Sequence, residues 1–88
     1  MLNNRISNLS QDSIRKKIAN YLLFEYENQK SLFIELPFSR KKMGELLNVP
    51  RPSLSRELTN MKNEGIIDFD RNTIKILKLD LLEEALWD

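Results

Sequence analysis

The chain has 88 residues, of which 41% are hydrophobic and 31% charged, and its formal net charge is +1. This size and composition fit one globular domain, and no apolar run approaches the roughly 20 residues of a membrane-spanning helix, which excludes a membrane protein. Because histidine and cysteine are absent, as is a signal-peptide pattern, we expect a cytoplasmic protein that holds no metal and is not an enzyme.

The chain begins with an apolar pattern and continues into a long predicted helix. Three apolar residues near the start are four and three residues apart: Leu2, Ile6 and Leu9. This spacing is typical of the end of a coiled-coil helix and equally of an apolar terminus. Residues 11–28 then have apolar positions at helical spacing, with Ser10 as a cap. We therefore divide the chain into residues 1–9, a helix end or linker, and residues 10–88, one folded domain.

A strand and a second helix are predicted next. Residues 32–36 are apolar and are followed by Pro37, as expected for a strand near the edge of a sheet. Ser39 then caps a helix over residues 40–47. A short turn over residues 48–50 follows, so a third helix lies close to the second.

Two prolines mark the start of this third helix. In NVPRPSLSREL, Pro50 and Pro52 fall where a helix tolerates proline, in and just before its first turn. The helix is predicted over residues 51–63 and ends before Gly65. Because Arg51 and Arg56 occupy its first turns, the helix is suited to pointing its N-terminal end at a negatively charged partner.

The end of the chain predicts a β-hairpin. Residues 66–69 and 73–79 read as two strands around a polar turn, and residues 81–87 as a short helix or ordered tail. The order helix, strand, helix, turn, helix, hairpin is that of a winged helix-turn-helix. We therefore expect an α+β fold, mainly α, in which a helical bundle carries a small antiparallel sheet and a hairpin wing.

The residues of the helix pair fit this geometry. Gly44 allows the two helices to approach closely, and Asn48 tolerates the left-handed backbone of the turn. Val49 and Leu54 supply the apolar contact between the helices. Together, and directly before a hairpin, these features indicate a helix-turn-helix.

The charge is uneven along the chain and the third helix has two faces. Residues 37–62 contain six basic and two acidic residues, a net charge of +4. At about 100° per residue, Leu54, Leu58 and Met61 face the core and Arg56 lies nearly opposite. The other outward positions are Pro52, Ser53, Thr59, Asn60 and Asn63. Such a polar face fits the DNA major groove, where arginine can bond the O6 and N7 of guanine.

The helix pair and hairpin resemble those of a known family. The segment LPFSRKKMGELLNVPRPSLSRELTNMKNEGIIDFDRNTIKIL, above all RPSLSREL followed by EGII, is similar to the DNA-binding domain of CRP/FNR (catabolite activator) transcription factors, over about residues 13–82. The resemblance implies sequence-specific binding of double-stranded DNA by a homodimer on a pseudo-palindromic operator. It also implies that residues 1–9 are the last turns of the dimerisation helix.

The resemblance implies roles for single residues. The arginine matching Arg56 reads guanine, the residue matching Ser55 contacts a neighbouring base, and the arginine matching Arg51 touches the first bases or the backbone. With Ser53, which lies on the outward face, these are the expected base contacts. The expected phosphate contacts lie on the second helix, the third helix and the hairpin turn: Ser39, Arg40, Lys41, Asn60, Arg71, Asn72 and Thr73.

Two positions depart from the family pattern. Pro52 stands where the best-known members have a glutamate that accepts from cytosine, so their half-sites, TGTGA or TTGAT, should not be assumed. Glu57 stands where the helix pair commonly has an apolar residue. We expect Glu57 to turn outward or to pair with a nearby lysine.

The family also implies parts that lie outside these 88 residues. Its members carry a preceding sensory domain that binds a cyclic nucleotide, another small molecule or a redox cofactor. The chain is then either an excised DNA-binding domain or a natural short form. We expect no cofactor in this domain, an unknown effector in the missing sensory domain, a largely monomeric state for these 88 residues alone, and contact with RNA polymerase as a further option. The alternative function is a winged helix that binds another protein, which predicts an apolar or acidic third helix.

Overall fold

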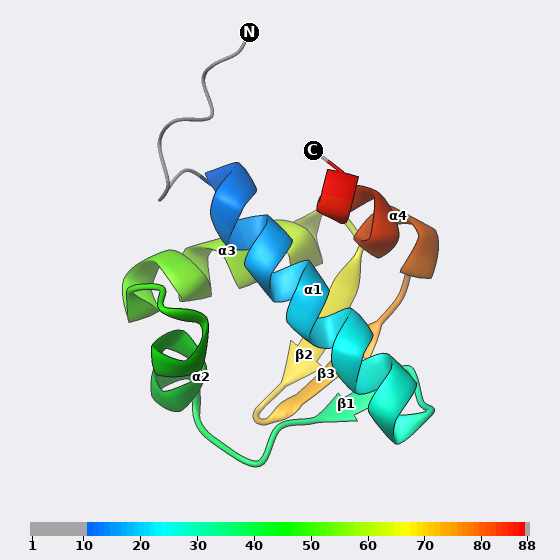
Figure 1. The fold of residues 1–88 in the computed structure, drawn as a ribbon, viewed down its shortest axis with the longest axis horizontal. Coiled ribbons are helices and arrows are strands. Elements are labelled where there is room, and N and C mark those ends of the chain that lie inside the picture. The colour runs from blue at the N-terminus through cyan, green and yellow to red at the C-terminus, as the bar shows by residue number, and fades with distance from the viewer. Residues whose placement is uncertain (1–10, 88) are drawn as a thin grey trace, which may run out of the picture.

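The computed structural model describes residues 11–87, which form helices around one small sheet (Figure 1). The helices are α1 (Gln11–Gln29), α2 (Arg40–Leu47), α3 (Arg51–Asn63) and α4 (Leu79–Glu84), followed by the 3-10 turn η2 (Ala85–Trp87). The strands are β1 (Phe33–Glu35), β2 (Ile67–Asp70) and β3 (Thr73–Ile76). This order confirms the predicted winged helix-turn-helix. The predicted cap Ser10 and the apolar spacing in residues 1–9 lie outside the described residues.

The three strands form one antiparallel sheet in the order β1-β3-β2. β1 therefore lies at an edge of the sheet, as predicted, and β2 and β3 form the predicted hairpin. Ile74 in the central strand β3 is paired with Ile34 of β1 and with Phe69 of β2. Ile34 and Ile74 are fully buried, so the sheet contributes one apolar face to the core.

The end of β3 differs from the prediction, and a backbone contact of Ile66 explains the difference. The carbonyl of Ile66 accepts hydrogen bonds from the N–H groups of Leu77 and Lys78, at 2.9 and 3.1 Å. The chain therefore turns after Ile76 and does not continue as a strand to the expected Leu79. It enters α4 directly.

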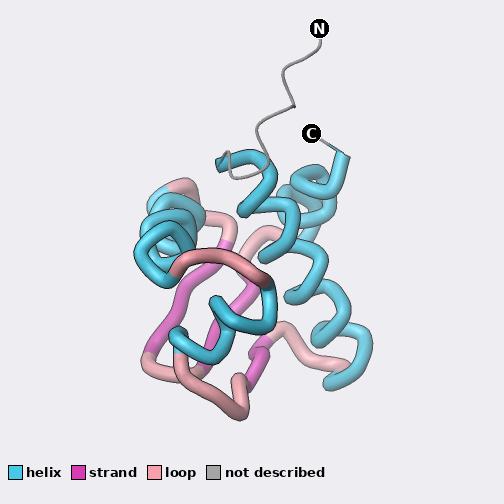
Figure 2. The backbone as a smooth tube through the Cα atoms, turned by 60° about the vertical axis from the view of Figure 1, so that its left-hand side comes forward, coloured by secondary structure: helices cyan, strands magenta, loops and turns pink. Residues whose placement is uncertain are grey.

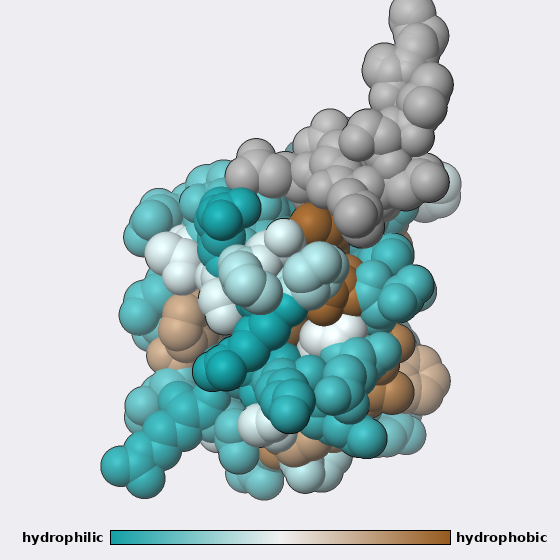
Figure 3. All heavy atoms as spheres, turned by 90° about the vertical axis from the view of Figure 1, so that its left-hand side faces the viewer, coloured by the Kyte–Doolittle hydropathy of each residue, from teal (hydrophilic) through white to brown (hydrophobic). Residues whose placement is uncertain are grey.

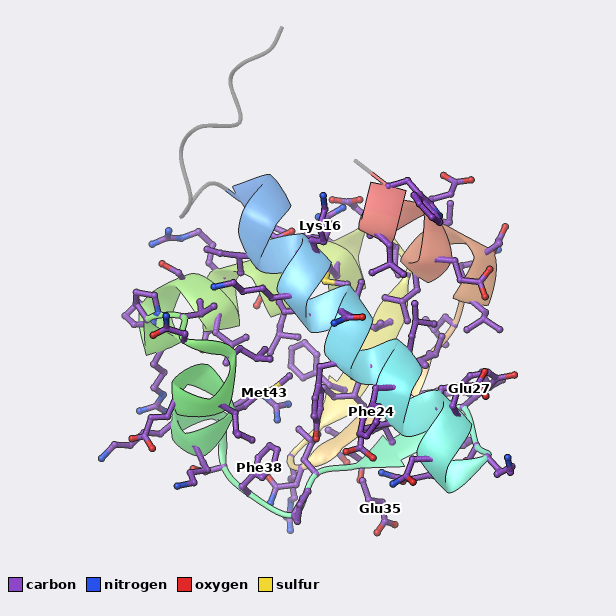
Figure 4. All side chains as sticks on the ribbon, viewed as in Figure 1. Lys16, Phe24, Glu27, Glu35, Phe38 and Met43 are labelled. Carbon is purple, nitrogen blue, oxygen red and sulfur yellow. The ribbon has the colours of Figure 1, made fainter. Side chains whose placement is uncertain are left out.

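The core lies between α1, α3 and the sheet. In Figure 1 α1 crosses in front of α3 and the strands, and in Figure 2 α1 runs along one side of the molecule while α2 and α3 occupy the other. Met43 points from α2 into this core (Figure 4) and is 1% exposed. Other large buried side chains come from every layer: Ile18, Leu22, Ile34, Leu54, Leu58, Met61, Ile67, Ile74, Ile76 and Leu82. α3 is therefore held by α1, α2 and β2 together.

The turn between α2 and α3 has the predicted local structure. Ser39 caps α2, because its hydroxyl accepts from the N–H of Lys42 at 3.4 Å. Asn48 adopts the left-handed conformation, with φ of 59°. The N–H of Val49 donates to the carbonyl of Gly44 at 2.8 Å. A Cβ atom on Gly44 would lie only 2.8 Å from the carbonyl oxygen of Val49, so the close approach is made by the backbone of the turn.

Replacing Gly44 with alanine is expected to destabilise the domain. In an open helix this change is worth about 1 kcal/mol in favour of alanine. Here the new methyl group would press on a backbone oxygen, and such overpacking typically costs about 1–3 kcal/mol. Urea unfolding of Gly44→Ala measures the sign of the net effect. The control is Leu46→Ala, at a position of α2 that is 58% exposed. An alanine variant at Gly44 more stable than the parent would contradict the close contact between Gly44 and Val49.

Candidate nucleic-acid interface

α3 has a buried side and an exposed side. Leu54, Leu58 and Met61 are at most 1% exposed and face the core, which confirms the predicted orientation of the helix. The opposite side presents these residues to solvent: Arg51, Pro52, Ser55, Arg56 and Thr59. Ser53 is half-buried. Figure 3 faces the side of the molecule on which α2 and the start of α3 lie, and most of the described surface visible there is hydrophilic.

The start of α3 offers charge and free donors. Pro50 is the N-cap residue and Pro52 lies in the first turn. The first helical hydrogen bond runs from the N–H of Leu54 to the carbonyl of Pro50, at 2.9 Å. The N–H groups of Arg51 and Ser53 precede that bond and have no partner within the helix. Two backbone donors therefore accompany the Arg51 guanidinium at the positive end of the helix dipole.

A shallow groove runs over the turn between the two helices. It is lined by Lys41, Gly44, Glu45, Asn48, Val49, Pro50 and Arg51, and we call it the turn groove. Lys41 comes from α2 and Arg51 from α3. The structure thus brings one predicted phosphate contact and one predicted base contact to the same groove.

The hairpin turn lies beside the segment that leads into α2. The N–H of Leu36 donates to the carbonyl of Asn72 at 2.8 Å, which joins the tip of the hairpin to the chain just before Ser39. Arg71 and Asn72 are exposed and Thr73 is half-buried. Arg71 holds the tight turn with a φ of 55°. The predicted phosphate contacts of the wing and of the start of α2 therefore lie at one end of the molecule.

Arg40 lies in a different environment from its neighbour Lys41. Its guanidinium sits 5.4 Å from the ring centroid of Phe69, and Lys62 reaches the same ring at 4.8 Å. One terminal nitrogen of Arg40 is buried without a hydrogen-bond partner among the described residues, and burial lowers the pKa of this guanidinium. Lys41 is exposed. The Arg40 side chain thus fastens the start of α2 to the hairpin strand β2, a contact that local sequence does not reveal.

The predicted environment of Glu57 is wrong. Glu57 neither turns outward nor pairs with a lysine: it is 2% exposed and its carboxylate accepts from Nε of Arg15 in α1 at 2.5 Å. Asn60, which we expected at phosphate, donates from Nδ2 to the same carboxylate at 3.3 Å. The reason is that α1 packs across α3, so Glu57 faces α1. Its partner Arg15 lies far away in the sequence.

Arg15 also binds a second carboxylate of the α3 segment. Its two terminal nitrogens donate to the two oxygens of Glu64, at 2.9 and 2.7 Å. The hydrogen bonds to Glu64, together with the one to Glu57, raise the pKa of Arg15 against the opposing effect of burial. The bond from Arg15 in turn lowers the pKa of Glu64. Arg15 and Glu64 are therefore both charged at neutral pH.

The described part of the chain contains neither a membrane-spanning helix nor a cluster of metal ligands. No helix within residues 11–87 is both long and apolar enough to cross a membrane. Over the same residues, no three carboxylate side chains gather as ligands for a metal ion.

A helix pair with a tight turn, a hairpin wing and a polar, basic outward face define a winged helix-turn-helix DNA-binding domain. Residues 16–85 match the family model described as the Crp-like helix-turn-helix domain, and the chain belongs to this family. It is therefore a DNA-binding domain of the kind used in transcription regulation. No curated protein sequence matches the chain.

Solved structures share the fold. The CO-dependent transcription factor CooA from Carboxydothermus hydrogenoformans superposes with a TM-score of 0.80 at 20% identity, over 90% of this chain and 39% of CooA. The catabolite activator protein from Thermus thermophilus gives 0.76 at 23% identity, over 90% of this chain and 36% of that protein. The chain thus spans less than half the length of these transcription regulators.

Proposed function

We propose that this domain binds double-stranded DNA in a sequence-specific manner, with α3 in the major groove. In this proposal Arg56 bonds the O6 and N7 of a guanine, and Arg51, Ser53 and Ser55 contact neighbouring bases. Pro52 has no side-chain donor or acceptor, so the base pair beside it is read by shape or not at all. The operator then differs from one read by a glutamate at this position.

The observation that carries this proposal is the absence of exposed acid on α3. Between residues 51 and 63 the only carboxylate is that of Glu57. It is 2% exposed and paired with Arg15. The outward face of α3 therefore presents arginine, hydroxyl and amide groups without a negative charge to repel phosphate. Neither an acidic nor an apolar docking face for a protein partner is present on this helix.

The phosphate contacts are proposed to come from exposed or half-buried groups at the start of α2 and in the hairpin turn. These are Ser39, Lys41, Arg71, Asn72 and Thr73. To reach a phosphate, Arg40 would have to leave the ring of Phe69, and Asn60 would have to leave Glu57. We therefore assign these two residues a smaller contribution to phosphate binding. The hydroxyl hydrogen of Ser39 remains available, because its oxygen acts as acceptor in the helix cap.

The wider protein is proposed to follow the family plan. Two copies would bind the two halves of a palindromic operator, residues 1–9 would end the helix that joins them, and residues 10–88 would form the DNA-binding domain of each copy. A sensory part would precede this domain and bind an effector, as CooA responds to CO. RNA polymerase is the further partner we propose, and the cytoplasm the location.

Selection from a random duplex library tests this proposal. The 88-residue chain is fused to a dimerising coiled coil, since one half-site alone supplies only part of the affinity, and selection is run at two salt concentrations. We expect a palindrome with a guanine that Arg56→Ala no longer selects. Binding that merely fades with salt and enriches no sequence would refute the proposal and direct the search to protein partners.

A further inference from the structure

Arg15 contacts both α3 and the residue that caps its C-terminal end. It donates to Glu57 at 2.5 Å and, through both terminal nitrogens, to the two oxygens of Glu64. Glu57 and Glu64 are about two helical turns apart, so both lie on the same side of α3 and its C-terminal cap. A bidentate arginine–carboxylate pair is strongly directional. Turning α3 about its axis would break both contacts together.

The buried carboxylate of this group is fully satisfied. One oxygen of Glu57 accepts from Arg15 and the other accepts from Nδ2 of Asn60 at 3.3 Å. A buried charge left without partners would be strongly unfavourable. The arrangement therefore favours one orientation of α3 over similar orientations. We call Arg15, Glu57, Asn60 and Glu64 the Arg15 clamp.

The apolar contacts of α3 do not fix the rotation of the helix about its axis with the same precision. Leu54, Leu58 and Met61 pack against the core through non-directional contacts, and cores tolerate small rearrangements. A rotation of α3 by about 20° would carry a side-chain tip about 5–6 Å from the axis through about 2 Å. A fork of two hydrogen bonds from Arg56 to guanine does not survive such a displacement.

We propose that the Arg15 clamp fixes the rotation of α3 about its own axis, and thereby sets the direction in which Arg56 and Ser55 face the bases. Arg15 and Glu57 are positioning residues, since they touch no base. The clamp connects α3 to the first turns of α1. Its effect on base reading rests on the proposed function, whereas its effect on the orientation of α3 does not.

The test replaces the clamp with apolar side chains of similar size. In the double variant Arg15→Met, Glu57→Leu no buried charge is left unpaired, and such exchanges are often neutral or stabilising. Glu64 remains in water, because its side chain is 51% exposed. The control is Lys16→Met, Glu27→Leu, which makes the same kinds of exchange, with the same net charge, at two exposed residues of α1 (Figure 4).

Three quantities are measured on each variant. The first is the urea midpoint of unfolding, and the second is the specificity ratio, which is the affinity of the dimerised domain for its selected duplex divided by that for a scrambled duplex. The third is the set of residual dipolar couplings of the α3 amides, compared with those of α1 in the absence of DNA. For the clamp variant we expect the urea midpoint and the affinity for scrambled DNA to be unchanged. The specificity ratio should be at least 10-fold lower, and the couplings in α3 should be altered. The control should match the parent throughout.

Each contrary result has its own meaning. Unaltered couplings in α3 would overturn the clamp, whether or not the parent prefers any sequence. Altered couplings with an unchanged specificity ratio would overturn its role in base reading. A parent without sequence preference would refute the proposed function, and the couplings would still decide the orientation of α3. If the double variant fails to fold, Arg15→Lys takes its place, because it keeps the charge but loses the fork. It is expected to show altered couplings in α3 and a lower specificity ratio. Couplings and a specificity ratio equal to those of the parent would overturn the clamp.

Discussion

Replacing Arg56 with alanine is expected to lower the affinity for the selected operator about 5- to 150-fold, the equivalent of about 1–3 kcal/mol for one bidentate contact to a base. Arg56 is exposed, so its removal leaves the core and the Arg15 clamp unchanged. Affinity for scrambled DNA should fall only slightly, because that binding depends on many phosphate contacts together. Anisotropy titrations against both duplexes measure the two affinities.

Lys41→Ala is the matched comparison for this prediction. Lys41 is an exposed cation of the turn groove and is proposed to contact phosphate. Its loss should weaken all sequences alike and reduce the slope of log affinity against log salt by about 1. If Arg56→Ala and Lys41→Ala behave alike, the division between base and phosphate contacts is wrong.

Leu54→Ala is expected to have the largest effect on folding. Leu54 is fully buried where α3 meets the core, and emptying such a site typically costs about 2–5 kcal/mol. The total free energy of unfolding of a small domain is about 5–15 kcal/mol, so the urea midpoint should fall sharply. Equilibrium unfolding followed by circular dichroism measures the change.

The neighbouring residue provides the control for Leu54. Ser55 is exposed on the same turn of α3, and Ser55→Ala should change the free energy of unfolding by no more than about 0.5 kcal/mol. It should instead weaken discrimination at one base of the operator. If the two variants lost equal stability, the rotation of α3 in the structure would be contradicted.

The elements that could be predicted from sequence are those set by local chemistry. Ser39, Asn48 and Pro50 act on the backbone within a few residues, and they indicated the limits of α2 and the start of α3 correctly. The end of β3 could not be found in this way. It depends on the carbonyl of Ile66, which bonds Leu77 across the hairpin.

The same distinction applies to the candidate site. Which residues of α3 face outward follows from helical periodicity, and the buried positions of Leu54 and Leu58 agree with it. The environments of Arg40 and Glu57 depend on partners in other elements, Phe69 and Arg15. No local pattern encodes these contacts. An acid at an expected apolar position, together with a basic residue early in α1, is the one signal that could have suggested the clamp.

The register of the sheet has a consequence for the synthesis of this domain. Phe33 of β1 pairs with Lys75 of β3, so both helices of the helix-turn-helix lie inside the loop that this pairing closes. Closing a long loop is entropically costly and comes late in folding. During translation α3 therefore emerges from the ribosome before β3, the central strand of the sheet that α3 contacts through β2. Nascent and truncated chains that end before Ile76 should leave the proposed operator unoccupied, since only the finished domain holds α3, the proposed recognition helix, in place.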